Sequence, residues 1–363
     1  MQHRARKWLR TTAIGAASAA LLATPAAAQA DPAGHPAGSI TWQTNTLRQV
    51  YVPPPGEYSY APSVVQRGDT RWVWTCHNSQ SRVIRDHVFL EKFVNGRLVE
   101  DRSVLQATEG AWDSFHTCDP SVVTGRFGYG GTTYGWAMFY LGNDVNASAH
   151  NQIGVAFAKS PEGPWVKYPD PVVPFDVTTQ WGVGQPSAIS TDPASGEVTL
   201  FYTRGDTSTR AYWRSLDFAD MTRPVIGDAH LVPLTGLRGT DGAADHLNDY
   251  DVAYDRGRDA FVAVREQHPY PADNPSWIGA TTDVDTISAS GLLSGTGTWR
   301  SLNSIGPSLT GLARNHNAGL VRTATGALPD SRHATVVFTS SCAGSTCDSL
   351  YSYDLWQLTG DLR

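Results

Sequence analysis

The stretch CDPSVV (118–123) recurs in altered form along the chain, and this recurrence predicts the fold. The segments that align with it are YAPSVV (60–65), GQPSAI (184–189), NDYDVA (248–253) and NHNAGL (315–320). Successive second residues of the five segments are separated by 58, 66, 64 and 67 positions. Such self-similarity at a near-constant period is typical of repeat architectures. We therefore expect five copies of one structural unit.

Each copy is followed by two further segments rich in strand-forming residues. After the first copy these are RWVWTCHN (71–78) and DHVFLEKF (86–93), with Gly, Asn and Asp turn signals between them. Units of four short antiparallel strands at this period are typical of propeller blades. We predict an all-β, five-bladed β-propeller that forms a single domain over residues 40–363. A β-sandwich of unrelated strands is the alternative.

Two segments near the N-terminus support further predictions. Residues 40–52 precede the first full repeat, and we expect them to form the outer strand of the last blade. Residues 1–30 have the features of a secretory signal peptide: a basic start, an apolar stretch over 13–23 and the cleavage site Ala28-Gln29-Ala30. We expect cleavage near Ala30, a flexible leader over residues 31–39, and a secreted protein.

Charge and hydropathy exclude two classes of partner. Removal of the four basic residues of the signal peptide changes the formal net charge from −6 to −10, and no Lys/Arg cluster remains. Nucleic-acid binding needs a concentrated basic surface, so we expect no nucleic-acid partner. No later segment has the roughly 20 apolar residues that a membrane helix needs. We expect no membrane partner, and a monomer.

The four cysteines favour disulfides, as is usual in an exported protein. Cys342 and Cys347 are close enough in sequence to close a short loop on each other, which leaves Cys76 to pair with Cys118. A zinc site is disfavoured because no CxxC or HxxxH spacing accompanies these thiols.

A propeller would bring several polar residues to one mouth of its channel. There the first strand of each blade begins and the second strand ends. The first strands would contribute the second residues of the repeats, namely Ala61, Asp119, Gln185, Asp249 and His316. Asp251 points to the same side of its strand as Asp249, and the second strands add Arg204 and Glu266. So many polar groups are costly unless they are solvated, paired or used in function.

At these residues the chain resembles a known group of enzymes. The five predicted blades, CDPSVV at the second blade and RNHNAG (314–319) at the fifth resemble the five-bladed β-propeller glycoside hydrolases. This group contains arabinanases, arabinofuranosidases and β-xylosidases, and is related to the invertase-type enzymes. The resemblance covers residues 40–363 as architecture and rests on short motifs.

The resemblance implies three acidic residues, from the first strands of blades one, two and three. Asp119 matches the second of them, but the matching positions of blades one and three hold Ala61 and Gln185. His316 resembles the channel histidine that in this group often helps to hold a metal ion or water. The resemblance therefore implies no required cofactor, with a structural Ca²⁺ ion in the channel, near His316, as an open expectation.

Glycoside hydrolysis needs one group that protonates the leaving oxygen and another that activates water or attacks the sugar. We expect Asp119 to be the general base and Asp249 or Glu266 the general acid, with Asp251 raising the pKa of the acid by like-charge repulsion. His316 is a second candidate for the acid.

Each of these residues also has a structural interpretation. Asp119 before Pro-Ser is a common turn residue, and Asp249 with Asp251 is compatible with a solvated strand entrance or a calcium site. Glu266 has Arg265 or Arg204 as potential ion-pair partners, and His316 is compatible with a core histidine.

Aromatic residues near the mouth favour a sugar partner. Trp112, Trp181 and Tyr250 are expected on or beside the loops that open the channel, where rings can stack on sugar faces, and Gln185, Arg204 and His316 would add polar contacts. The leading hypothesis is a secreted glycoside hydrolase acting on furanose- or pentose-containing polysaccharide or oligosaccharide of the arabinan or xylan type. The alternative is a non-catalytic glycan-binding propeller that has lost the usual acid and base. A sialidase-type hydrolase is disfavoured, because the Ser-x-Asp-x-Gly-x-x-Trp repeat of those proteins is absent.

Overall fold

The computed structural model describes residues 37–174, 181–205 and 208–363. The expected signal peptide (1–30) and most of the expected leader (31–39) lie outside the described residues. At the start of the described chain, the backbone N–H of Gly38 donates a hydrogen bond to the carbonyl of Arg363 at 2.5 Å. Among the described residues, no helix is both long and apolar enough to cross a membrane.

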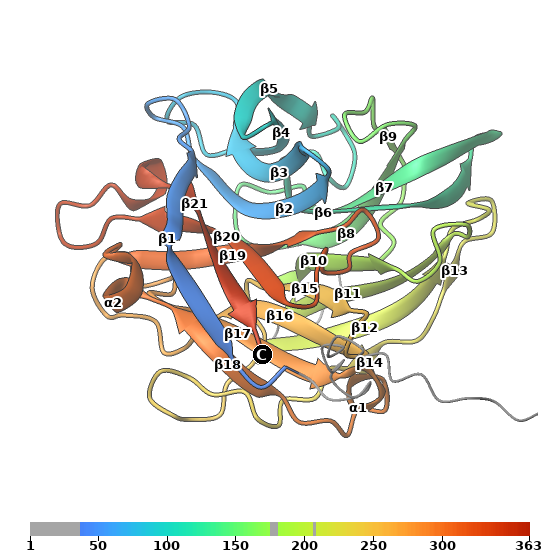
Figure 1. The fold of residues 1–363 in the computed structure, drawn as a ribbon. Helices are drawn as coiled ribbons and strands as arrows, with labels where there is room; N and C mark the ends of the chain where they lie inside the picture. The colour runs from blue at the N-terminus through green and yellow to red at the C-terminus, as the bar shows by residue number, and fades with distance from the viewer. Residues whose placement is uncertain (1–36, 175–180, 206–207) are drawn as a thin grey trace, which may run out of the picture. The chain divides into compact units, whose positions relative to one another are not determined.

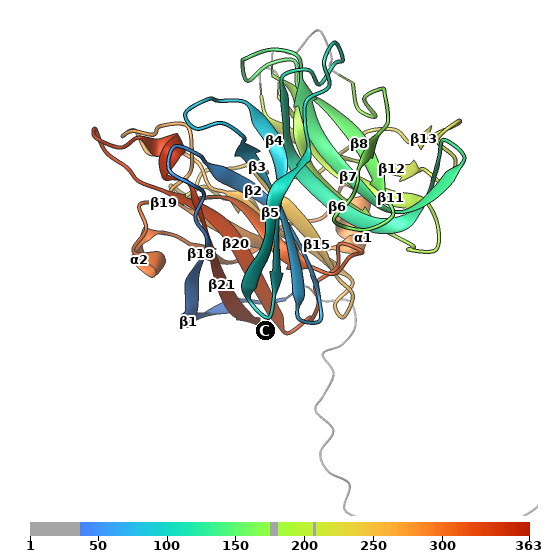
Figure 2. The ribbon, with the colours of Figure 1, turned by 90° about the horizontal axis from the view of Figure 1, so that it is seen from above.

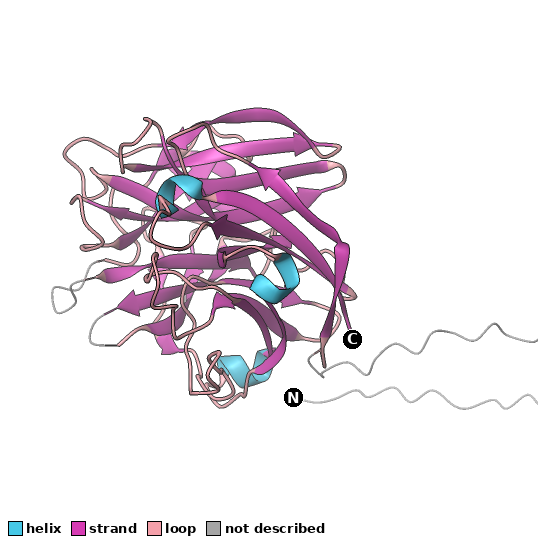
Figure 3. Cartoon of the chain, turned by 90° about the vertical axis from the view of Figure 1, so that its left-hand side faces the viewer, coloured by secondary structure: helices cyan, strands magenta, loops and turns pink. Residues whose placement is uncertain are grey.

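Strands dominate the described chain, and the helices are few and short (Figure 3). Most strands are linked in chain order into antiparallel groups, which follow the sequence repeats. The first two groups are β2 (Ser59–Arg67), β3 (Thr70–Asn78), β4 (Asp86–Val94) and β5 (Arg97–Leu105), then β6 (His116–Tyr129), β7 (Thr132–Asn143), β8 (Gln152–Ala158) and β9 (Val166–Lys167). The third is β10 (Gly182–Ser190), β11 (Glu197–Gly205), β12 (Arg210–Asp217), β13 (Val225–Ile226) and β14 (His230–Leu231).

The remaining strands form the fourth and fifth groups. The fourth is β15 (Asp251–Asp255), β16 (Ala260–Glu266), β17 (Thr282–Ser288) and β18 (Arg300–Ile305). The fifth is β19 (Arg314–Arg322), β20 (His333–Ser341), β21 (Asp354–Leu362) and β1 (Ile40–Tyr51). The short helices are α1 (Ala289–Leu293), α2 (Pro307–Thr310) and the 3₁₀ helix η1 (Ser349–Ser352).

The N-terminal strand completes the last group, as predicted. Strand β1 runs antiparallel to β21, with Ile40 opposite Leu362, and Figures 1 and 2 show the blue strand beside the red one. Strand β19 also pairs in parallel with β2, with Val321 opposite Val64. The first and fifth groups are thereby joined in one sheet.

The repeated segments share an unusual backbone conformation. One residue in each first strand, or just before it, has a positive φ of 39° to 51°; these residues are Ala61, Asp119, Gln185, Asp249 and Asn317. The left-handed region is uncommon for residues other than glycine, so its recurrence shows that these positions are structurally equivalent. The fifth equivalent residue is therefore Asn317, and the predicted alignment on His316 was wrong by one position.

Four of the five first strands are fastened to the next one by a side chain two residues beyond these positions. The backbone N–H groups of Val122, Ala188 and Val252 donate to hydroxyls of the preceding strand at 2.9 to 3.2 Å, and that of Leu320 donates to a carboxylate at 3.0 Å. The acceptors are Ser63, Ser121, Ser187 and Asp251. Between β19 and β2 the fifth residue is Gly319, where a Cβ would lie 1.9 Å from the Pro62 carbonyl oxygen. The five first strands therefore form a ring.

Both predicted disulfides are present, Cys76–Cys118 and Cys342–Cys347, and no cysteine is free. The first joins β3 of the first group to β6 of the second, with 4.8 Å between the Cα atoms. The second closes the loop after β20. Apolar side chains fill the space between neighbouring groups; Phe139 and Phe218, for example, stack with their ring centroids 6.0 Å apart.

Candidate functional site

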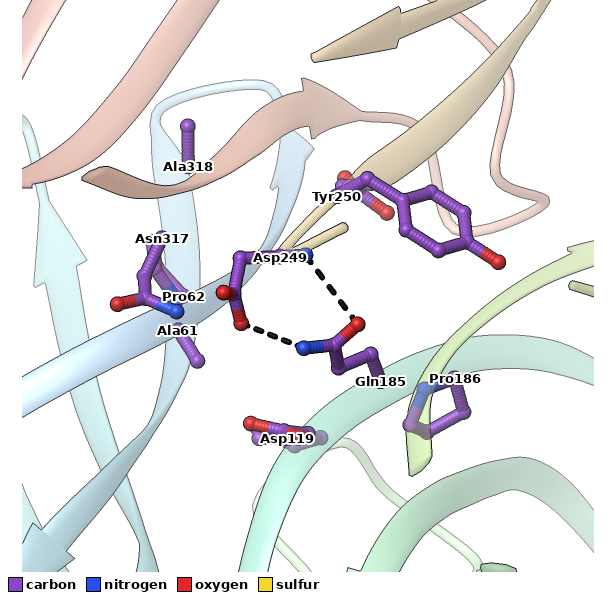
Figure 4. Close-up of a pocket in the computed structure, with 11 residues that line it drawn as sticks. Ala61, Pro62, Asp119, Gln185, Pro186, Asp249, Tyr250, Asn317 and Ala318 are labelled. Atoms are coloured by element: carbon purple, nitrogen blue, oxygen red, sulfur yellow. Dashed lines mark hydrogen bonds between the residues drawn. The ribbon is translucent and has the colours of Figure 1, made fainter. Parts of the chain in front are cut away.

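The ring of first strands lies against two pockets. A small pocket of about 360 Å³ is lined by the five positive-φ residues and their neighbours (Figure 4). A large pocket of about 1790 Å³, including its open mouth, shares four of those residues: Asp119, Gln185, Asp249 and Asn317. Other side chains that line the large pocket include Tyr60, Asp86, His116, Trp181, Tyr270, Trp277 and Tyr353. Asp119 and Asp249, from the second and fourth repeats, thus border the same open space.

Asp249 is held by amide groups. The Gln185 side chain donates from Nε2 to Asp249 Oδ1 at 2.6 Å, and the Asp249 backbone N–H donates to Gln185 Oε1 at 3.2 Å (Figure 4). Asn248 Nδ2 donates to the other carboxylate oxygen at 3.0 Å. Burial raises the pKa of Asp249 to about 6, while His268 and the amide donors oppose the rise. These donors favour the ionised form.

Asp119 has different surroundings. Its backbone N–H points at Cys76 Sγ at 2.8 Å, and its Oδ1 atom lies 3.5 Å from Cys76 Sγ and 3.4 Å from Cys118 Sγ. Burial, and then the Asp249 and Asp86 carboxyls, raise the pKa of Asp119 to about 7, against the opposing effect of the Gln185 backbone N–H. At neutral pH this side chain is therefore close to half protonated.

Glu266 lies behind the wall of the large pocket. It is the last residue of β16, its side chain is fully buried, and it accepts backbone hydrogen bonds from Gly279 at 2.7 Å and Asn317 at 3.0 Å. Burial and the Asp249 carboxyl raise the pKa of Glu266 well above its ordinary value. Glu266 therefore holds the Asn317 backbone and responds to the charge of Asp249, but it does not line either pocket.

Asp251 has a structural role that the sequence did not indicate. Its carboxylate accepts hydrogen bonds from the Ser187 hydroxyl at 2.7 Å and from the Leu320 backbone N–H at 3.0 Å, and it pairs with the buried Arg322 at 3.1 Å. It occupies the position that serine holds in the first three repeats, where the side chain joins neighbouring strands. The expectation that Asp251 raises the pKa of the general acid has no support in this geometry.

His316 is fully buried, with Nδ1 2.7 Å from Asn317 Oδ1 and its ring edge-on to Tyr353. Burial lowers the pKa of His316 to about 4, so the ring is neutral near pH 7 and is a poor candidate for the general acid.

Two clusters among the described residues bring metal-ligand atoms together, and neither includes His316. One consists of Asp119 and the disulfide sulfurs, which carry no thiolate charge. The other is Asp245, His246 and His268. There Asp245 lies 2.7 Å from His268 Nδ1 and 2.6 Å from the buried Arg265. Burial opposes ionisation of Asp245, but His268 and Arg265 still hold its pKa well below its usual range.

The three aromatic residues expected near the channel mouth have different surroundings in the structure. Trp181 lines the large pocket, whereas Trp112 stacks on Tyr140 and donates its indole N–H to the Pro169 carbonyl at 3.0 Å. Tyr250 borders the small pocket with its ring buried in an apolar cluster. Arg204 is not among the residues described as lining either pocket.

Sequence reasoning missed Trp277. It lies in the loop between β16 and β17, its side chain is 59% exposed, and it lines the large pocket. The signal was a tryptophan in the turn-rich segment NPSWIG (274–279), where no strand would bury it.

The fold and its pocket define a class: an all-β ring of strand groups with carboxylates at one mouth. No family model and no curated protein matches the sequence. Solved structures do match. Zg3597, a family 117 glycoside hydrolase of the marine bacterium Zobellia galactanivorans, matches with a TM-score of 0.57 and 9% identity, over 89% of this chain and 90% of that one.

Two fungal structures are similar to the same extent. The α-L-arabinofuranosidase PaAbf62A from Podospora anserina has a TM-score of 0.57 and 12% identity, and the catalytic domain of the GH62 α-L-arabinofuranosidase of Coprinopsis cinerea has 0.57 and 13%. Each match covers 89% of this chain and 97% of the other. The chain therefore has the fold of the β-propeller glycoside hydrolases, which confirms the prediction of an all-β propeller.

Proposed function

We propose that the protein is a secreted glycoside hydrolase that cleaves a pentose-containing glycan of the arabinan or xylan type in the large pocket. The observation that carries the proposal is that Asp119 and Asp249 both line this pocket, each with a raised pKa. Perturbed carboxyl groups in a cleft are characteristic of catalytic sites. The names of the structural neighbours, which include α-L-arabinofuranosidases, support the substrate class.

The surroundings of the two carboxyls favour one assignment of roles. Asp249 receives two amide donors, which stabilise its charge, so it serves as the general base and takes a proton from water. Asp119 keeps its proton to a higher pH and donates it to the leaving glycosidic oxygen. Water attacks the anomeric carbon as that bond breaks, which gives inversion. This assignment is the reverse of the one expected from the sequence.

Aromatic side chains support a sugar ligand. Trp277 and Trp181 lie on loops at the large pocket, and flat rings of this kind pack against the apolar faces of sugars. The two disulfides are consistent with an extracellular site of action.

The second candidate function is glycan binding without hydrolysis. The observation that favours it is the pair of hydrogen bonds between Gln185 and Asp249, because an amide stands where the resemblance implies a catalytic carboxylate. In this case the pocket would bind the same glycans and release no product.

The test is product release from arabinan, arabinoxylan and xylan by the wild type, Asp119→Asn and Asp249→Asn, with binding measured in parallel. Asp220→Asn, a change in an exposed turn, is the control. We expect the wild type and the control to release sugar and each pocket variant to lose at least about a hundredfold in kcat. Binding without release in the wild type would establish the second function. Full activity in both pocket variants would refute the proposal.

A further inference from the structure

The Cys76–Cys118 disulfide is part of the wall of the large pocket. Cys118 lines this pocket beside Asp119, and Cys76 is fully buried behind it. The Cys76–Cys118 bond connects two strand groups, whereas the Cys342–Cys347 bond joins two cysteines that are five positions apart in one loop. Its position beside a pocket carboxyl suggests more than a contribution to stability.

The disulfide touches Asp119 at both its backbone and its side chain. The Asp119 N–H points at Cys76 Sγ at 2.8 Å, at a residue with the left-handed conformation (φ 45°) that the repeats share. The carboxyl oxygen Oδ1 is 3.4 to 3.5 Å from both sulfur atoms. The Tyr60 hydroxyl lies 3.2 Å from Cys118 Sγ.

A disulfide sulfur carries no hydrogen, so it cannot donate to the carboxyl group at these distances. A thiol at the same place could, because S–H is a weak donor. The contrast with Asp249 is direct, since its two carboxyl oxygens receive N–H donors from Gln185 and Asn248. Asp119 has the Gln185 backbone N–H on its carboxyl but no donor on the side of the two sulfur atoms. Two carboxyls in one site are driven toward different protonation states when one receives more donors than the other.

We propose that the Cys76–Cys118 disulfide is a positioning element of the proposed active site, which fixes Asp119 at the pocket and presents no hydrogen-bond donor to the Oδ1 atom that faces the sulfurs. The inference rests on the proposed function, in which Asp119 is the general acid. A general acid must carry a proton, and a wall without donors on this side favours the protonated form of Asp119. The other titratable groups that act on Asp119 are the Asp249 and Asp86 carboxyls, and the Tyr60 phenol faces the same sulfur.

The test compares the oxidised and reduced forms of one folded protein. In the Cys342→Ala/Cys347→Ala background, the Cys76–Cys118 bond is the one disulfide left. A water-soluble phosphine reduces it: the phosphine gives two electrons to the sulfurs, and one water molecule supplies the two protons of the thiols and the oxygen of the phosphine oxide. The pKa of Asp119 is then measured by carbon-13 NMR of the carboxyl group, assigned with Asp119→Asn, without substrate. We expect reduction to lower this pKa by about one unit.

Two pairs of substitutions give an independent measurement. Cys76→Ser/Cys118→Ser supplies hydroxyl donors, and Cys76→Ala/Cys118→Ala supplies none, although both remove the cross-link. We expect the pKa of Asp119 and the alkaline limb of kcat/KM against pH to move down in the serine pair relative to the alanine pair. A structural role alone would change both pairs equally.

The outcomes separate this inference from the proposed function. An unchanged pKa of Asp119 in the reduced protein and equal values in the two pairs would overturn the inference. A pKa that shifts in a protein without hydrolytic activity would overturn the role of Asp119 in catalysis, while the effect of the disulfide on its carboxyl would stand.

Discussion

Gln185 and Asp249 exchange two hydrogen bonds between the third and fourth repeats: Gln185 Nε2 donates to Asp249 Oδ1 at 2.6 Å, and the Asp249 N–H donates to Gln185 Oε1 at 3.2 Å. The amide supplies one donor and one acceptor, and both are used. A carboxylate at residue 185 would instead face a second carboxylate and lose the donor. The exchange therefore explains how Asp249 can remain ionised at this half-buried position.

Gln185→Glu tests this relationship. Because a neighbouring negative charge raises the pKa of a carboxyl, we expect the pKa of Asp249 to rise by about one unit or more. The proposed base would then be protonated at pH 6, and kcat/KM there should fall about tenfold, with partial recovery as the pH rises. The measurement is the pH profile of kcat/KM, and the exposed Gln106→Glu is the control for added charge. An acidic limb that does not move would contradict the assignment of Asp249 as base.

Asp119→Asn should stabilise the protein at alkaline pH. Burial raises the folded-state pKa of Asp119 to about 7 from its ordinary value of 3.8, so the folded state binds more protons between these pH values. The contribution of the Asp119 carboxyl to the stability of the folded state is thus most favourable below pH 4 and is lost as the pH rises through 7. Asparagine has no such charge and tolerates the left-handed backbone.

We expect the free energy of unfolding of Asp119→Asn to exceed that of the wild type by about 1–2 kcal/mol at pH 8, with the difference shrinking toward pH 4. Urea unfolding at the two pH values measures it, and Asp220→Asn serves as the reference. A difference that grows toward low pH would mean that the carboxyl is stabilised in its charged form, contrary to the burial described here.

The repeats could be predicted from their near-constant period, and the Cys342–Cys347 disulfide from its short spacing. The Cys76–Cys118 disulfide followed by elimination, and the strand closure followed from the one strand left over before the first repeat. The fifth repeat was misaligned because it lacks the proline that follows Ala61, Asp119 and Gln185, so nothing in the letters distinguished His316 from Asn317. The positive φ of 39° identifies Asn317 as the equivalent residue, and this backbone angle could not be read from the amino-acid sequence.

The functions of Asp251 and Glu266 could not be predicted, because both depend on partners far along the chain. Asp251 is neutralised by Arg322, and Glu266 accepts the backbone N–H of Asn317. Alternation along a strand places a side chain on a face, but it does not say whether that face meets solvent or another strand.

Gly319→Ala should disrupt the junction between the first and fifth groups. A Cβ there would lie 1.9 Å from the Pro62 carbonyl oxygen, which belongs to the backbone and cannot turn away. We expect a loss of at least about 3 kcal/mol in the free energy of unfolding, since the parallel pairing of β19 and β2 would have to separate. The matched control is Gly135→Ala, where the nearest atom to the new Cβ would be 3.8 Å away. If thermal unfolding showed equal stability for the two variants, Gly319 could not lie this close to the Pro62 carbonyl oxygen.

Trp277→Ala should weaken glycan binding without affecting the fold. The side chain is 59% exposed at the mouth of the large pocket, so its removal leaves no cavity in the core. Stacking of an aromatic ring is worth about 0.5–1.5 kcal/mol, so we expect the Kd or KM for polysaccharide to rise about twofold to tenfold with little change in kcat. Trp277→Phe should restore most of the affinity, and Val225→Ala, at a similarly exposed position on β13, should have no effect. Titration calorimetry with arabinan and arabinoxylan checks the affinity, and unchanged binding by Trp277→Ala would remove this residue from the substrate site.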